Sequence, residues 1–202
     1  QEARRQRQMC IRDRYNRFYI NFLKEKYIMK EGDKLPNVVF KVRSMGAWLN
    51  RTTKQFFKGK RVILFSLPGA FTPICSNQML PNYEKLHKTF KEYGIDQIYC
   101  MSVNDSFVMN AWAADQKLKN IKVIPDGNCT FTDKIGMGVM KEEPGFGRRS
   151  WRYSAIINDG VVEKVFEEPG KGDNTKGDPY EISSPESVLK YLQSTTLDSN
   201  AI

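Results

Sequence analysis

Apolar runs alternate with amphipathic stretches through the middle of the chain. Residues 62–67, 95–103 and 121–124 are short and almost wholly apolar, which is typical of buried strands. Residues 76–93 and 106–118, which lie between these runs, repeat apolar side chains every three or four positions, as helices with one buried face do. Strands separated by helices in this order predict parallel strands joined by right-handed crossovers, and therefore an α/β fold.

The C-terminal part of the pattern predicts a hairpin and a closing helix. Two β-rich runs within residues 150–169 flank the pair Asp159 and Gly160, which is a strong hairpin signal. A short helix is expected within residues 130–138, before a glycine-containing loop. A final amphipathic helix is expected after Ser184, whose hydroxyl suits an N-cap.

The N-terminal part of the pattern is less regular. Residues 29–43 end in alternation that is typical of an edge strand or a hairpin. Residues 47–59 predict a loop or a short helix, and we expect its aromatic side chains, Trp48, Phe56 and Phe57, to pack in the core.

The composition is that of one globular domain. The chain has 202 residues, of which 40% are hydrophobic and 27% charged. No apolar run approaches the roughly 18 residues of a membrane span, and no secretory signal pattern is present. The four cysteines and one histidine lack metal-ligand spacing, so we expect neither a metal nor an organic cofactor. We expect a soluble, cytoplasmic protein without membrane or nucleic-acid partners.

The net charge of +9 is concentrated at the N-terminus. Residues 1–28 hold eight basic and three acidic residues, and they lack a clean apolar stripe. We therefore expect an N-terminal extension, disordered or non-native, before a single domain at residues 29–202. Its segment RQRQMCIRDR resembles translated sequencing-adapter sequence, an interpretation that makes Met29 the natural start and leaves Cys10 without biological meaning.

The turn after the first apolar run builds a candidate nucleophile at Cys75. Pro68 and Gly69 end the strand, and a helix is expected to begin with Thr72 as its N-cap and Pro73 in its first position. Cys75 then lies in the first turn, where free N–H groups and the helix dipole stabilise a thiolate. The alternative is a small, inert core thiol, the usual state of a free cysteine.

Several motifs carry a resemblance to a known family. PGAFTPICS, residues 68–76, resembles the peroxidatic signature of peroxiredoxins, and its PGAFTP form resembles the type II, or peroxiredoxin-5-like, subfamily. The resemblance implies a thioredoxin-like fold with a central mixed β-sheet flanked by helices. It also implies a thiol-dependent peroxidase that reduces hydrogen peroxide and alkyl hydroperoxides through a cysteine sulfenic acid. Further matches follow in order: SVND (102–105), FVMNAW (107–112), PDGN (125–128), GFGRRSWRYS (145–154) and DPYEISS (178–184).

The resemblance also implies site residues. In type II peroxiredoxins an arginine of an RYS-like strand stands over the reactive thiolate, with the threonine three residues before the cysteine and the proline of the PGAFTP loop. These positions are Arg152, Thr72 and Pro68 here. Arg152 and Thr72 would hold the peroxide oxygens, and Pro68 would shield Cys75 from water. Spacing alone leaves a structural salt bridge open for Arg152, and it leaves two neighbours, Arg148 and Arg149, as equal candidates.

The reduction of oxidised Cys75 is expected to differ from that in some members of the family. Some type II members carry a resolving cysteine in the C-terminal third, but residues 130–202 contain none. Glutathione with glutaredoxin, or thioredoxin acting directly, would suffice as reductant. The DPYEISS form resembles bacterial members, including those fused to glutaredoxin domains, which favours glutathione. Cys100 or Cys129 stays open as an internal partner, provided that the Cα atoms approach within about 7 Å.

The sequence leaves other functions open as alternatives to a peroxidase. A thiol-disulfide oxidoreductase of the thioredoxin fold normally carries CxxC, but position 78 is Gln. A redox sensor or holdase would use the same cysteine without turnover. The basic arm, residues 1–28, would suit a nucleic-acid-binding protein through backbone contacts and stacking, although we expect no such binding. The resemblance finally implies a homodimer with Phe71 and Phe107 at its contact.

Overall fold

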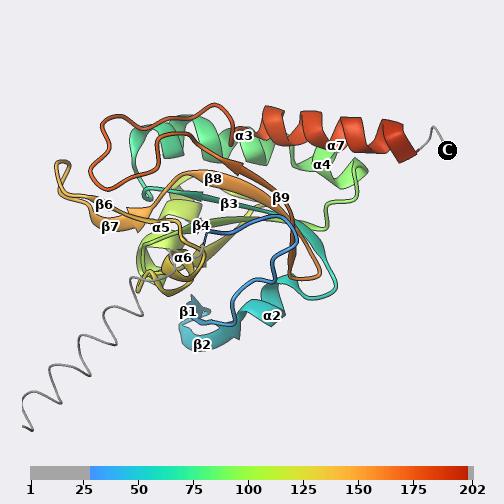
Figure 1. Ribbon diagram of the computed structural model, residues 1–202. Helices are drawn as coiled ribbons and strands as arrows, with labels where there is room; N and C mark the ends of the chain where they lie inside the picture. The colour runs from blue at the N-terminus through green and yellow to red at the C-terminus, as the bar shows by residue number, and fades with distance from the viewer. Residues whose placement is uncertain (1–27, 200–202) are drawn as a thin grey trace, which may run out of the picture.

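The structure, a computed structural model, describes residues 28–199, so nearly all of the predicted N-terminal extension, Cys10 included, lies outside the described residues. A five-stranded mixed sheet forms the centre of the molecule (Figure 1). In spatial order its strands are β5 (Lys122–Pro125), β4 (Gln97–Ser102), β3 (Arg61–Leu67), β8 (Tyr153–Asn158) and β9 (Val161–Glu167). The first three are parallel, whereas β8 and β9 are added antiparallel. The predicted α/β class with a mixed sheet is confirmed.

Strand β3 is buried because both faces of the sheet are covered. The six residues from Val62 to Leu67 have no exposed surface, which explains their continuous apolar pattern. Ile63 and Phe65 face one core, whereas Val62 and Leu64 face a second core on the other side. The alternation follows the period of two residues along a strand.

Helices close the first core, and shorter elements close the second. The first core receives side chains from η1 (Cys75–Met79), α3 (Leu80–Lys85), α4 (His87–Glu92), α5 (Ser106–Asp115) and α7 (Pro185–Ser199). The second receives side chains from β1 (Val39–Ser44), α2 (Thr53–Phe57) and α6 (Thr130–Lys134). Figure 1 shows α3 and α7 above the sheet and α2 below it. Within residues 28–199, no helix has the length and apolar character needed to cross a membrane.

The helical segment after β3 is interrupted, where the apolar spacing predicted one helix. In the π-helix η1, the N–H of Leu80 donates to the carbonyl of Cys75. The chain continues as α3 and α4, which are separated at Leu86. Pro81 has no N–H to bond four residues back, which favours the wider π turn before it. The segment ends at Gly94 in the left-handed region (φ +77°), as predicted.

Two regions contain hairpin strands that were not predicted, although the short helix expected within residues 47–59 is present as α2 (Thr53–Phe57). Residues 47–52 form β2 (Ala47–Thr52), which pairs with β1, and the short helix α2 begins only after it. Trp48 on β2 is exposed, so the prediction that it packs in the core is wrong, whereas Phe57 is fully buried. Residues 138–150 form β6 (Gly138–Lys141) and β7 (Gly147–Ser150). Their buried positions include the polar residues Lys141 and Ser150, so no alternating apolar pattern marked them.

The predicted C-terminal elements are confirmed. β8 and β9 form an antiparallel hairpin around Asp159 and Gly160. The hydroxyl of Ser184 accepts a hydrogen bond from the N–H of Ser187 at 3.3 Å and caps α7. Residues 173–179, which are mostly polar, contain no helix or strand.

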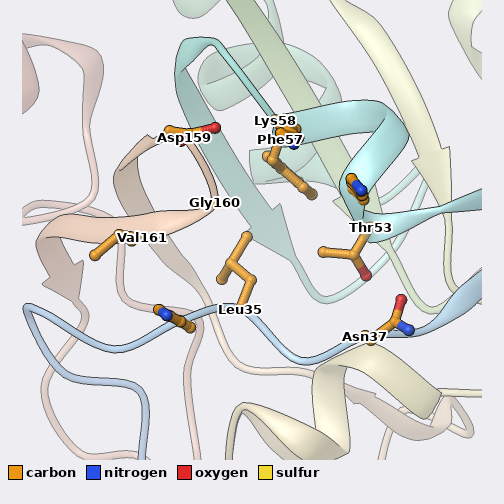
Figure 2. Close-up of a pocket in the computed structure, with 10 residues that line it drawn as sticks. Leu35, Asn37, Thr53, Phe57, Lys58, Asp159, Gly160 and Val161 are labelled. Carbon is orange, nitrogen blue, oxygen red and sulfur yellow. The ribbon is translucent and has the colours of Figure 1, made fainter.

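A cavity of about 570 Å³ lies beside the turn between β8 and β9 (Figure 2). Leu35, Phe57 and Val161 give it apolar walls, and Lys58 and Asp159 lie at its edge. These residues adjoin the beginning of β3, whereas the loop with Pro68 follows the end of that strand. The cavity and the candidate site are therefore at opposite ends of the sheet.

Candidate active site

The loop after β3 places Cys75 in a buried position. Pro68 is buried, and the helical segment begins at Pro73, so Cys75 lies in its first turn as predicted. The Cys75 side chain has no exposed surface. Thr72 holds the predicted N-cap position, because its carbonyl accepts the N–H of Ser76 at 2.9 Å, but its hydroxyl donates to the carbonyl of Gly69 at 2.8 Å. The short loop uses the hydroxyl to satisfy its own backbone.

Neighbouring elements hold this loop in place. The side-chain oxygen of Asn104, just after β4, accepts the N–H of Ala70 at 3.0 Å and the hydroxyl of Ser102 at 2.7 Å. On α5, the indole N–H of Trp112 donates to the hydroxyl of Ser76 at 3.0 Å. Sequence reasoning gave Asn104 and Trp112 no such role, although the SVND and FVMNAW motifs contain them. Their contacts fix the loop on both sides of Cys75.

Arg152 reaches Cys75 from the connection between β7 and β8. Its side chain is 1% exposed, and its two terminal nitrogens, Nη1 and Nη2, both lie 3.6 Å from the Cys75 sulfur. The strand β8 begins one residue after Arg152. Arg148 instead forms an ion pair with Asp133, and Arg149 donates to backbone carbonyls. Of the three candidate arginines, the structure brings Arg152 to the cysteine.

Three further residues surround the guanidinium group. Asp178 forms an ion pair with Nη2, the Met79 sulfur lies 3.2 Å from Nη1, and the Tyr180 ring centre lies 5.6 Å away. Burial lowers the pKa of Arg152, but the charges of Cys75 and Asp178 outweigh it and raise that pKa overall. Arg152 is therefore a cation. Sequence reasoning gave Asp178 no role, although it opens the DPYEISS motif and a buried arginine requires an anionic partner.

The other two described cysteines are buried thiols. Cys100 on β4 has no exposed surface and shares a core with Cys75, and burial raises its pKa well above the ordinary value. Cys129 is 5% exposed, which is more than Cys100, as predicted. Burial, followed by the charge of Asp133, raises the pKa of Cys129 to about 12. Neither thiol forms much thiolate at neutral pH.

Comparison with known proteins agrees with this geometry. Residues 30–181 match the Redoxin family model. Over 146 residues, which are 72% of this chain and 82% of the relative, the chain is 62% identical to a peroxiredoxin of Rhizobium etli. The chain belongs to the peroxiredoxin family. This peroxiredoxin is a thiol-dependent peroxidase, as the sequence motifs predicted.

Two further relatives define this peroxiredoxin more closely. It is 54% identical over 162 residues to the hybrid peroxiredoxin hyPrx5 of Haemophilus influenzae; the match spans 80% of this chain and 66% of the relative. The crystal structure of the Plasmodium falciparum antioxidant protein, a 1-Cys peroxiredoxin, superposes with a TM-score of 0.79 at 40% identity, covering 82% of this chain and 99% of that one. The type II, peroxiredoxin-5-like assignment and the thioredoxin-like fold are confirmed.

Proposed function

We propose that Cys75 is the thiol with which this peroxidase attacks peroxides, and that Arg152, Thr72 and Pro68 complete its site. The observation that carries the proposal is the approach of both terminal nitrogens of Arg152 to within 3.6 Å of the buried Cys75 sulfur. A guanidinium group at that distance stabilises a thiolate and offers N–H donors to an oxygen next to it.

The residues of the site support a direct displacement at oxygen. The Cys75 thiolate attacks one peroxide oxygen, so an S–O bond forms while the O–O bond breaks. The departing oxygen takes up a proton and leaves as water or an alcohol, and Cys75 becomes a sulfenic acid. Arg152 donates to the oxygens as negative charge moves onto the leaving group. The substrates are hydrogen peroxide and alkyl hydroperoxides.

Thr72 and Pro68 have complementary parts in this proposal. The Thr72 hydroxyl already donates its hydrogen to Gly69, so its oxygen is available to accept a hydrogen bond from the peroxide O–H. Pro68 is buried and has no N–H, so it presents an apolar surface that keeps water from the thiolate. Thr72 would thereby orient the peroxide while Arg152 polarises it.

We further propose that an external thiol reduces the sulfenic acid. The raised pKa values of Cys100 and Cys129 argue against either as a resolving thiol at neutral pH. Glutathione, with glutaredoxin to complete the cycle, is the proposed reductant, and thioredoxin is the alternative. The thiolate of glutathione attacks the sulfur of Cys75 and releases water, leaving a mixed disulfide for a second thiol to reduce.

The proposed working form is a cytoplasmic homodimer of the domain at residues 29–202. Phe71 is 54% exposed and Phe107 is 58% exposed, which is unusual for phenylalanine on a monomer surface. Phe107 contacts Trp48 edge to face, with ring centres 5.6 Å apart. These exposed rings support a contact between two copies near the loop that carries Cys75.

A single-turnover reaction tests the proposed role of Cys75. The reduced protein is mixed with hydrogen peroxide, and its intact mass is followed for the wild type and for Cys75→Ser. We expect a rapid gain of one oxygen, or of one glutathione when glutathione is present, in the wild type only. Loss of two hydrogens would instead indicate an internal disulfide. Equal oxidation of both proteins would contradict the assignment of Cys75.

A further inference from the structure

Arg152 is a buried cation with one oxygen acceptor for its side chain among the described residues, the carboxylate of Asp178. Its other acceptors are the sulfur atoms of Cys75 and Met79, and sulfur accepts hydrogen bonds weakly. Cys75 carries a negative charge as a thiolate. Once it is oxidised to a protonated sulfenic acid, it is neutral. Since a buried cation without a counter-ion is costly, Asp178 is the partner that stays charged while Cys75 is oxidised.

Glu168 links the segment that carries Asp178 to the backbone of Arg152. The Glu168 residue is 1% exposed, and its Oε1 accepts hydrogen bonds from the N–H groups of Glu181 and Ser183, both at 2.8 Å, and from the Ser183 hydroxyl at 2.7 Å. The N–H of Glu168 donates to the carbonyl of Arg152 at 3.2 Å. Glu168 is therefore hydrogen-bonded both to the backbone of Arg152 and to the segment that carries Asp178.

Two more anchors hold this segment, which connects β9 to α7 and contains no helix or strand (Figure 1). The buried ammonium group of Lys141 donates to the carbonyls of Thr175 at 3.4 Å and Gly177 at 3.2 Å. On α3, the Tyr83 hydroxyl donates to the carbonyl of Ser183 at 2.9 Å. Side-chain contacts therefore set the position of a segment that has no regular structure of its own.

We propose that Asp178 is a positioning residue that keeps the Arg152 guanidinium over Cys75 through the whole catalytic cycle, and that Glu168 holds Asp178 in place. The inference rests on the proposed function, because it assumes that Cys75 and Arg152 react with the peroxide. In the oxidised stage Cys75 offers no negative charge, and the ion pair with Asp178 keeps Arg152 from turning away. When an external thiol restores the thiolate, the donors are already aligned for the next peroxide.

Two reactions of Cys75 test this role in parallel. Reaction with hydrogen peroxide needs the thiolate and the donors of Arg152, whereas alkylation by iodoacetamide needs only the thiolate. We expect Asp178→Ala and Asp178→Asn to slow the peroxide reaction about 10- to 100-fold, the equivalent of one charged hydrogen bond. Alkylation, compared on the plateau of its pH profile where Cys75 is fully ionised in every variant, should stay within about threefold of wild type. Asp178→Glu should recover part of the loss, and Glu181→Gln, an exposed position of the same segment, is the matched control.

The outcomes separate this inference from the proposed function. Equal losses in both reactions, or wild-type peroxide rates in Asp178→Ala and Asp178→Asn, would overturn the positioning role. Cys75→Ser is measured in the same assay. If it reacted with peroxide as fast as the wild type, the proposed function itself would fail, whatever the Asp178 variants did.

A double-mutant cycle tests the part assigned to Glu168. Glu168→Gln keeps an acceptor oxygen but loses the charge, so we expect a folded protein with a smaller loss of peroxide reactivity than Asp178→Ala. If Glu168 acts through Asp178, adding Glu168→Gln to Asp178→Ala should cause no further loss. Losses that multiply in the double variant would show that Glu168 acts independently and would overturn this part.

Discussion

Cys75 and Cys129 occupy similar places in the fold but have opposite surroundings. Each follows a parallel strand of the sheet, β3 or β5, and each lies at the start of a helical segment. The Cys75 sulfur lies 3.6 Å from the guanidinium nitrogens of Arg152. The Cys129 sulfur instead donates to the carboxylate of Asp133 at 3.4 Å. One cysteine faces a cation and the other faces an anion.

The helix N-terminus beside Cys129 is also already occupied. The carboxylate of Asp126 accepts hydrogen bonds from the N–H groups of Phe131 at 3.1 Å and Thr132 at 2.8 Å. An anion therefore uses the first-turn donors of α6 that could otherwise stabilise a thiolate. The comparison teaches that the start of a helix does not by itself set the electrostatic surroundings of a cysteine, because the neighbouring side chains can carry either sign of charge.

The largest effect is expected from replacing the cation beside Cys75. Lysine in place of Arg152 keeps the positive charge but loses the planar pair of donors. We expect Arg152→Lys to lower the second-order rate constant for hydrogen peroxide about 100- to 1000-fold, as loss of an oxyanion donor does. Arg148→Lys is the matched control, because Arg148 pairs with Asp133 away from the site. Equal rates in the two variants would contradict the assignment.

A smaller loss is expected at Thr72. Thr72→Val keeps the shape of the side chain but removes the oxygen proposed to accept from the peroxide, so the rate constant should fall about tenfold. Thr72→Ser keeps the hydroxyl and should retain most of the activity. Stopped-flow measurement with hydrogen peroxide distinguishes them. A serine variant as slow as the valine variant would point to packing of the methyl group instead.

The anionic surroundings of Cys129 predict a pH-dependent reactivity. Because its pKa is raised to about 12, its thiolate is scarce at neutral pH and its alkylation should accelerate as pH rises toward that value. In a Cys75→Ser background at about pH 8, Asp133→Asn should lower that pKa and speed alkylation of Cys129 about three- to tenfold. Arg148→Gln should act in the opposite direction, since Arg148 lowers the pKa of Cys129. Peptide mass spectrometry reports both rates, and changes of the same sign would contradict this account.

The smallest effect is expected from removing the other cysteines. Cys100→Ala and Cys129→Ala should leave the first reaction with hydrogen peroxide within about twofold of the wild-type rate, because neither thiol is readily ionised. Intact mass after oxidation should show an added oxygen in each variant. A tenfold loss in either variant, or a disulfide that disappears with it, would assign that cysteine a part in the cycle.

Local sequence signals predicted the framework around Cys75. The apolar run of β3, the break at Pro68 and Gly69, and Pro73 at the start of the helix each depend on neighbours within a few positions. The hairpin around Asp159 and Gly160 was predictable for the same reason, because its turn residues favour the required backbone conformation. These elements were confirmed.

Other predictions failed where a tertiary contact decided the structure. Thr72 holds the expected N-cap position, but the role expected of its side chain differs, because its hydroxyl donates to the carbonyl of Gly69 in a tight loop. Trp48 was expected in the core, but it lies on an exposed hairpin and contacts Phe107. Residues 138–150 form a hairpin without a strong apolar pattern, because its buried positions include the polar residues Lys141 and Ser150.

By itself the sequence determined the α/β class, the order of its main elements, the place of Cys75 in a first turn and, through its motifs, the peroxiredoxin family. Each of these depends on residues close together in the chain. The resemblance pointed to Arg152 beside Cys75, but only the tertiary structure decided that Asp178 pairs with Arg152 and that Asp133 meets Cys129. Arg152 lies 77 positions from Cys75 and 26 from Asp178. Contacts over such separations depend on how the sheet and its connections pack, and no local pattern encodes that packing.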